Sequence, residues 1–144
     1  MIKIICIGKL KEKYLIDGVE DYLKRLRKYH KIDLIELPDS NITSEGNEIL
    51  KHISQKDYII SLAIKGIELS SIELSEKLDK IFISNSNITF VIGGSNGIRE
   101  DILKQSNMLL SFSKLTYPHG LFRIILLEQI YRSFKILNNE TYHK

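Results

Sequence analysis

Residues 88–97 read Ile-Thr-Phe-Val-Ile-Gly-Gly-Ser-Asn-Gly, and residues 108–119 read Met-Leu-Leu-Ser-Phe-Ser-Lys-Leu-Thr-Tyr-Pro-His. Each stretch begins with an apolar run and continues into residues typical of loops, which predicts a strand followed by its exit. Ligands of an open α/β sheet bind at the carboxyl ends of its strands. The two exits carry many backbone donors and acceptors and are flanked by histidine and arginine, so they indicate a cofactor site beside an anionic substrate.

The second exit contains a proline that divides a loop from a helix. Pro118 cannot lie within a central strand, and it disfavours helix at Tyr117. Residues 112–117 are therefore expected to be an extended loop whose backbone groups need partners. A small polar ligand could supply those partners, or the loop could wrap around another part of the chain. His119 then falls at the start of the last helix, where amide groups attract anions; alternatively, it caps that helix.

The first exit is rich in glycine. Residues 93–97, Gly-Gly-Ser-Asn-Gly, allow the backbone to approach a ligand closely, because glycine has no Cβ and tolerates positive φ. The stretch lacks the Lys-Ser/Thr of a P-loop, and it is not the dinucleotide-binding fingerprint that follows a first strand. A tight connection from strand to helix explains the glycines equally well.

Strand-like and helix-like patterns alternate along the rest of the chain. Five strands are expected, at 2–8, 32–37, 58–64, 88–92 and 108–112. Helices are expected within 11–29, 41–55, 71–83, 99–106 and 121–137. This alternation predicts one α/β domain over residues 1–144, with a parallel sheet and helices on both faces.

Local signals refine these boundaries. Ser44 is a plausible N-cap of the second helix, and Ser70 with Glu73 fits a capping box for the third. The dipeptide Lys65-Gly66 is expected to turn the chain after the third strand. The inward face of the third helix is expected to include Ile72.

The last predicted helix is apolar nearly all round. Its core-facing residues are expected to be Ile124, Leu127, Ile130, Tyr131 and Phe134, which leaves on other faces Leu121, Ile125, Leu126 and Ile136. Such a helix usually packs against a second surface, so we expect a homodimer through it. Arg123 and Arg132 lie on roughly opposite sides of the helix, and either could instead form an ion pair, Arg132 with Glu128.

Composition limits the class of protein. The 144 residues carry 43% hydrophobic side chains and a net charge of +3, which fits one domain and permits an anionic partner. No apolar run approaches the ~20 residues of a membrane span. The N-terminus reads as a strand and not as a signal peptide, so a cytoplasmic location is expected. Much of the positive charge closes the first helix, where a helix C-terminus attracts cations anyway.

Reactive side chains are sparse. Cys6 is expected to be a buried core thiol. The four histidines have no ligand-like spacing, so no metal site is expected. The terminal Tyr142-His143-Lys144 is either frayed or able to stack on a base and contact phosphate.

The chain resembles the RlmH family of large-subunit rRNA pseudouridine N3-methyltransferases, within the SPOUT superfamily. Besides the two stretches quoted above, the resemblance rests on Ile-Gly-Lys-Leu-Lys-Glu-Lys-Tyr at 7–14, Ile-Asp-Leu-Ile-Glu-Leu-Pro at 32–38, Glu-Gln-Ile-Tyr-Arg-Ser-Phe-Lys-Ile at 128–136 and the terminal Tyr-His-Lys. It covers nearly the whole chain. It implies a C-terminal trefoil knot, S-adenosyl-L-methionine as methyl donor, an obligate homodimer, and a pseudouridine in a hairpin loop of 23S rRNA, within the assembled ribosome, as substrate.

The resemblance also implies the site residues. The cofactor contacts fall on Leu62, Gly93, Phe112, Ser113, Lys114, Leu115, Thr116 and Tyr117. The catalytic residues on the substrate side fall on His119, Arg132, Tyr142 and His143, with Arg123 as a weaker candidate. In this family the tail of one protomer approaches the cofactor of the other. The segment Asp39–Glu45 is shorter than is usual for the family and is expected to lie away from the cofactor loops.

Different catalytic roles can be assigned to these residues. Either His119 or His143 would take the proton from N3 of the base, Arg132 would stabilise the developing oxyanion, and Tyr142 would stack on or orient the base. The alternative is a non-catalytic α/β module that binds a ligand or RNA on a flavodoxin-like scaffold, because fold alone does not decide activity. That alternative predicts no methyl transfer.

Overall fold

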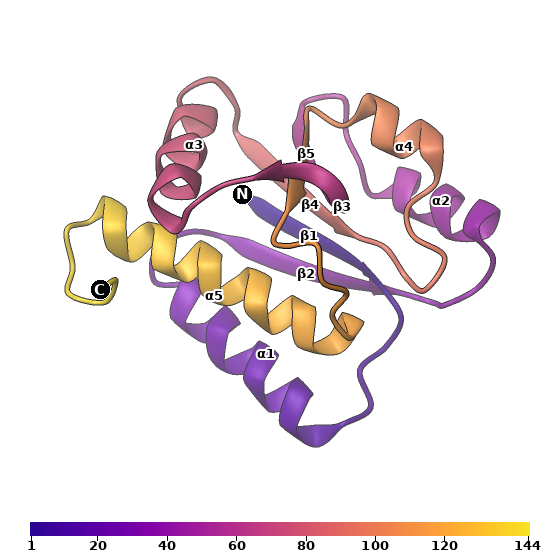
Figure 1. Cartoon of the computed structure of the whole chain (residues 1–144), viewed down its shortest axis with the longest axis horizontal. Coiled ribbons are helices and arrows are strands. Elements are labelled where there is room, and N and C mark those ends of the chain that lie inside the picture. Colours follow the sequence, from indigo (N-terminus) through magenta and orange to yellow (C-terminus); the bar gives the residue numbers. More distant parts are fainter.

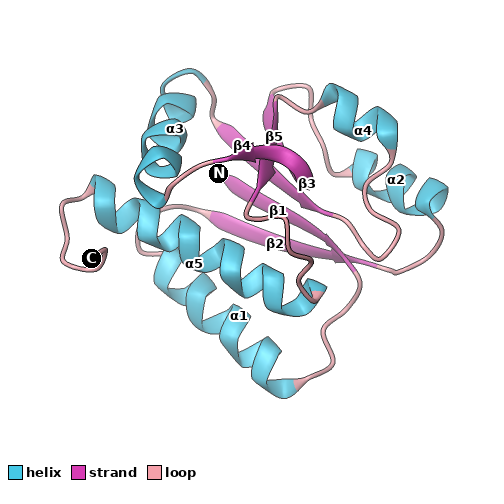
Figure 2. Ribbon diagram, viewed as in Figure 1, coloured by secondary structure: helices cyan, strands magenta, loops and turns pink.

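A sheet of five parallel strands, covered by helices on both faces, forms the centre of the computed structural model, which describes residues 1–144 (Figures 1 and 2). The strands are β1 (Ile2–Ile7), β2 (Ile32–Leu37), β3 (Asp57–Glu68), β4 (Asn87–Ile92) and β5 (Met108–Ser111). The helices are α1 (Lys13–Leu26), α2 (Ile42–Lys51), α3 (Ser71–Ser84), α4 (Glu100–Gln105) and α5 (His119–Leu137). The strand order is β2-β1-β4-β3-β5, and every pair is parallel. The predicted alternation of strands and helices is confirmed.

Two apolar layers hold the helices on the sheet. Along β1, Ile2, Ile4 and Cys6 enter the larger core with α1, α3 and α5, whereas Ile5 and Ile7 enter a smaller core with α2 and α4. Successive strand residues point to opposite faces, so a sheet buried on both sides requires nearly continuous apolar strands such as β1, where Lys3 is the one charged residue. The sheet therefore presents its strand ends, and not its faces, to ligands.

The thiol of Cys6 lies fully buried in the larger core. Burial raises the pKa of this thiol to about 12, so the reactive thiolate is essentially absent at neutral pH. We expect iodoacetamide to leave Cys6 unmodified in the native protein and to alkylate it readily in denaturant, as followed by mass spectrometry. Equal alkylation rates in the two conditions would show that the first strand is not packed as described.

The third strand differs from its prediction. It continues to Glu68 and does not turn at Lys65-Gly66. Its register against β5 shifts between Leu62 and Ile67, both of which pair with Leu110. A Cβ on Gly66 would lie 2.6 Å from the carbonyl oxygen of Leu109. The glycine therefore permits a bulge pressed against the neighbouring backbone, a role that a single-strand pattern cannot distinguish from a turn.

The N-termini of α2 and α5 differ from their predictions, whereas that of α3 is as predicted. The amide of Ser44 donates to Asn41 Oδ1 at 2.9 Å, so Asn41 is the N-cap of α2 and Ser44 is not. Helix α5 begins at His119, two residues before the predicted start, and no side chain caps it. The capping box of α3 is present, with Glu73 N to Ser70 Oγ at 3.1 Å and Ser70 N to Glu73 Oε1 at 2.9 Å.

Helix α5 lies between α1 and α3 on one face of the sheet (Figure 1). Leu126 is fully buried there, which corrects its assignment to an outer face. Leu121 is 41% exposed, and Ile125 is half-buried. Ile72 of α3 is 49% exposed, so it does not belong to the inward face predicted for it. None of the helices combines the length and the apolarity that crossing a membrane requires.

Candidate active site

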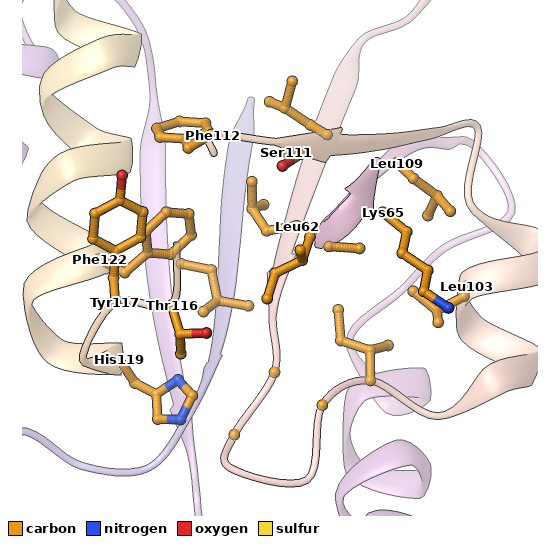
Figure 3. A pocket seen from close by; sticks show the side chains of 18 of the residues that line it. Leu62, Lys65, Leu103, Leu109, Ser111, Phe112, Thr116, Tyr117, His119 and Phe122 are labelled. Carbon is orange, nitrogen blue, oxygen red and sulfur yellow. The ribbon is translucent and has the colours of Figure 1, made fainter. Parts of the chain in front are cut away.

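The carboxyl ends of β4 and β5 and the middle of β3 border a cavity of about 950 Å³ (Figure 3). Three segments of the chain line it: residues 62–65 of β3, residues 92–95, 97 and 98 at the end of β4 and after it, and most of residues 109–117. The first residues of α5 and the side of α4 close its two ends. A parallel sheet brings these strand exits to one edge, as the sequence predicted for the two exits.

Most of the predicted cofactor contacts meet at this cavity. Its lining includes Leu62, Gly93, Phe112, Ser113, Leu115, Thr116 and Tyr117. Lys114 is the member of the predicted set that does not line the cavity, and it is exposed. His119 lines the cavity from the first turn of α5 (Figure 3).

Two serine side chains hold the loop of residues 112–117. Ser113 Oγ accepts from Leu115 N at 3.0 Å and lies 3.0 Å from the Tyr117 hydroxyl. Ser111 Oγ donates to the Ser113 carbonyl at 3.0 Å. No backbone–backbone hydrogen bond begins or ends on residues 112–117. Apart from the Leu115 amide and the Ser113 carbonyl, the backbone groups of this loop thus have no hydrogen-bond partner within the chain, as predicted. The chain bends at residues 112, 114 and 115, so the loop is not extended throughout.

An aromatic wall stands beside the loop. The ring centroids of Phe112 and Phe122 are 5.1 Å apart in an edge arrangement, and the rings of Tyr117 and Phe122 are stacked with centroids 5.6 Å apart. A concave, mostly apolar surface with a few polar groups that fix orientation is typical of small-molecule sites. The arrangement suits a ligand that has a flat ring and a polar edge.

The glycine-rich exit of β4 folds back on itself at the cavity floor. Gly97 has φ of +76° and donates its N–H to the Gly94 carbonyl at 3.0 Å. A Cβ on Gly93 would lie 2.7 Å from the carbonyl carbon and oxygen of Gly97. Only glycine fits at position 93, and the backbone is thereby exposed to the cavity.

A second polar group lies at the far end of α5. The Nε of Arg132 donates to Glu128 Oε1 at 2.8 Å, and its NH1 is 3.1 Å from His143 Nδ1. The guanidinium carbon lies 4.8 Å from the centre of the Tyr142 ring, whose hydroxyl donates to Glu128 at 3.3 Å. The tail is therefore folded back against α5, so the reading of this tail as frayed is wrong for Tyr142.

Electrostatics fix the protonation of this second group. Burial, together with the nearby Glu128 carboxylate, raises the pKa of Tyr142 to about 12. The hydrogen bond to Glu128 raises the pKa of Arg132. At neutral pH the phenol is therefore neutral and the guanidinium charged, and the Arg132–Glu128 ion pair that sequence reasoning allowed is present at 2.6 Å.

The two groups are well separated within one chain. His119 is the first residue of α5, and Arg132 lies on its fourth turn. At 1.5 Å per residue, the helix separates them by about 20 Å. The four predicted catalytic residues are therefore split, with His119 at the cavity and Arg132, Tyr142 and His143 away from it.

Arg123 is buried and holds elements of the fold together. Its side chain is 2% exposed and donates to Glu36 Oε2 at 2.7 Å, to the Gly8 carbonyl at 2.7 Å and to the Ile7 carbonyl at 3.0 Å. It ties α5 to the exits of β1 and β2, which a substrate-binding role does not require. The ion pair that sequence reasoning offered as the alternative is the arrangement observed.

The segment Asp39–Glu45 is placed differently from the expectation. The Nδ2 of Asn96 donates to the Ser40 carbonyl at 3.4 Å, and a Cβ on Gly94 would lie 3.6 Å from Asp39 Oδ1. The segment thus touches the glycine-rich exit, because β2 and β4 flank β1 and end at the same edge of the sheet. Burial raises the pKa of Glu45, whose Oε2 accepts from Ser40 N at 2.8 Å. No group of three or more metal-ligating side chains occurs in the structure.

Comparison with known proteins identifies relatives over the whole chain. A family model described as "Predicted SPOUT methyltransferase" matches residues 1–143. A protein of Enterococcus faecalis named "Ribosomal RNA large subunit methyltransferase H" is 47% identical, with 99% of each chain covered. A protein of the same name from Caldicellulosiruptor saccharolyticus is 45% identical, with 100% of each chain covered.

A solved structure shares the fold. The chain superposes on "a probable methylase family protein" from Haemophilus influenzae with a TM-score of 0.59 and 14% sequence identity. The match covers 99% of this chain and 70% of that one. At this identity the likeness concerns the fold alone.

Proposed function

The chain belongs to the SPOUT methyltransferase family, and from that premise we propose that it methylates N3 of a pseudouridine in a hairpin loop of large-subunit rRNA, in the assembled ribosome, with S-adenosyl-L-methionine as donor. Its full-length relatives are named for ribosomal RNA of the large subunit. The observation that carries the proposal is the 112–117 loop, which presents an unpaired backbone to a cavity at the strand ends.

The cavity fits the proposed cofactor. S-adenosylmethionine supplies an electrophilic methyl group on a sulfonium. Its adenine would meet the open backbone groups of residues 112–117, and Leu62 and Phe112 would cover its apolar faces. Gly93 would let the chain approach closely, since the space that a Cβ would need is taken by Gly97. The backbone would thus hold the ligand without a charged side chain from this loop. Its one charged residue, Lys114, is exposed and does not line the cavity.

The separation of the two polar groups supports a site shared between two copies. Arg132, Tyr142 and His143 cannot reach the cavity of their own chain across about 20 Å of helix. In a homodimer formed through α5, the tail of one protomer would reach the cavity of its partner. The outward-facing Leu121 and Ile125 supply apolar surface for that contact. We further propose that residues 112–117 form part of a trefoil knot through which the C-terminal segment passes.

The chemistry needs a base and an anion stabiliser. N3 of pseudouridine is an imide nitrogen, a poor nucleophile until its proton is removed or shared. His119, from the cavity, or His143, from the partner's tail, would accept that proton as N3 bonds to the methyl carbon and the C–S bond breaks. The cationic Arg132 would stabilise the negative charge that develops on the uracil oxygens. Tyr142, held neutral, would stack on or orient the base.

The identity of the base can be read from pH–rate profiles. A neutral imidazole base makes the rate fall as pH drops through its pKa, because the protonated ring cannot accept a proton. Replacing the histidine that acts as base with alanine should lower kcat by about 10²-fold and remove this acidic limb. The two variants to compare are His119→Ala and His143→Ala. The variant that leaves the base in place should keep the fall in rate at low pH. If both variants retain the wild-type rate and profile, histidine is not the base.

Subunit complementation tests the shared site. Gly93→Val should distort the glycine-rich segment that lines the cavity, because its Cβ would clash with the Gly97 backbone, and Arg132→Gln should disable the tail. Each pure variant should therefore lack methyl transfer to large ribosomal subunits. Chains refolded together in equal amounts should regain about a quarter of wild-type activity, since half the dimers carry one intact site of two. Sedimentation of each variant as a folded dimer is the control. No recovery from such folded mixed dimers would mean that each site is built by one chain.

A further inference from the structure

One short stretch of the chain carries a large excess of positive charge. Residues 22–32, which include the end of α1, contain five cationic side chains and no carboxylate, whereas the whole chain carries a net charge of only +3. The remainder of the chain is therefore net negative. We call this cluster the α1 basic surface; it consists of Lys24, Arg25, Arg27, Lys28 and Lys31.

These cations are exposed and mostly unpaired. All five side chains are exposed, and Arg25 alone has a carboxylate partner, Asp21 at 3.2 Å. A helix C-terminus stabilises cations within its last turn. Helix α1 ends at Leu26, so that effect accounts for Lys24 and Arg25 but not for Lys28 and Lys31. Charge repulsion among neighbouring cations, left uncompensated within the chain, indicates an anionic partner.

The α1 basic surface borders the tail that carries the proposed substrate residues. The guanidinium of Arg25 lies 5.4 Å from the Tyr22 ring centre and 5.7 Å from that of Tyr131. The Tyr131 ring in turn contacts Tyr142, with centroids 5.0 Å apart. Figure 1 shows α1 and α5 running in the same direction, with the chain terminus beyond their shared end. Tyr29 fastens the two elements, because its hydroxyl donates to Glu140 in the tail at 2.7 Å.

We propose that the α1 basic surface binds the phosphate backbone of the large-subunit rRNA next to the target nucleotide. The inference rests on the proposed function, which makes the tail the substrate side. Exposed lysine and arginine side chains bind phosphates by charge and fix the position of a nucleic acid without reading its sequence. A second copy of this chain is the less suitable occupant, because a two-fold contact through this surface would oppose two sets of unpaired cations.

The test compares two triple variants of equal charge loss. Lys24→Gln/Arg27→Gln/Lys28→Gln removes three cations of the α1 basic surface. Lys56→Gln/Lys77→Gln/Lys80→Gln removes three exposed lysines elsewhere, none of which has an ion-pair partner. Co-sedimentation with purified large ribosomal subunits at several salt concentrations gives the affinity, and methylation kinetics give KM for subunits.

The first triple should weaken binding to subunits and raise KM by about 10-fold or more, and the slope of log affinity against log salt should become shallower by about 2. The control triple should stay within about twofold of wild type, because its charges lie away from the phosphates. Equal behaviour of the two triples, or loss of the dimer in the first, would overturn the proposal. Co-sedimentation needs no methyl transfer, so failure of the catalytic assignment would leave this result readable.

Discussion

Replacing Arg132 with Gln is expected to lower kcat for methyl transfer to large ribosomal subunits by about 10²- to 10³-fold, the usual cost of removing one preorganised donor to a developing oxyanion. Arg132 is held charged by its hydrogen bond to Glu128, and its NH1 faces His143 of the tail. Because the role proposed for Arg132 is on the uracil oxygens and not on the cofactor, affinity for S-adenosylmethionine should remain at the wild-type value. Single-turnover kinetics and calorimetric titration of the cofactor separate the two effects.

Lys135→Gln is the matched control for Arg132→Gln. Lys135 is also on α5, ion-pairs with Glu140 at 3.0 Å, and lies 5.6 Å and 5.4 Å from the ring centres of Tyr29 and Tyr131. Losing it removes a tail-fastening contact of the same kind but no group assigned to the reaction. We expect kcat within about threefold of wild type, the scale of an exposed ion pair. A similar collapse in both variants would mean that Arg132 acts only by fastening the tail.

Arg123→Met is expected to lower the free energy of unfolding by about 3 kcal/mol, near the lower end of the range for breaking a buried ion pair. The change leaves the Glu36 carboxylate without its cation and the carbonyls of Ile7 and Gly8 without their side-chain donor. The lower end applies because Glu36 keeps 32% of its side chain exposed and can regain water. Urea unfolding, followed by circular dichroism, measures the change.

The exposed pair Lys13–Asp17 provides the comparison. Its side chains are 87% and 58% exposed, so Lys13→Met should change stability by less than about 0.5 kcal/mol. Glu36→Gln tests the same buried pair from its other side and should destabilise less than Arg123→Met, because NH2 of Arg123 still donates to the carbonyls of Ile7 and Gly8. Equal, small effects of Arg123→Met and Lys13→Met would show that Arg123 does not lock α5 to the sheet.

The pattern of apolar residues was enough to predict the fold, because this sheet is buried on both faces. Mostly apolar stretches rich in β-branched residues, such as Ile2–Ile7 and Asn87–Ile92, are distinct from helical stretches, and the parallel arrangement follows from their alternation. The bulge in β3 could not be read in the same way. Gly66 indicates a break in the strand pattern. Whether the chain turns there or packs against β5 depends on Leu109 and Leu110, which come more than forty residues later.

The candidate site was predictable in part. Pro118 disfavours helix at Tyr117 through local steric clashes, so a loop before α5 was predictable. The contact between Ser40 and Asn96 was missed, since it depends on the strand order, which local patterns do not encode. Likewise, nothing in the pattern of α5 distinguished a buried Arg123 from a substrate ligand. Its partner Glu36 alternates with apolar residues in β2 and reads as an ordinary solvent-facing position.

An assay of methyl transfer is the most direct test of the proposed methylation of large-subunit rRNA. The measurement is incorporation of label from S-adenosylmethionine into ribosomes purified from cells that lack this gene, with the modified nucleotide located by primer extension. We expect label at a single pseudouridine of large-subunit rRNA, and none when uridine occupies that position. A folded protein that binds the cofactor but leaves such ribosomes unlabelled, or that labels uridine equally well, would contradict it.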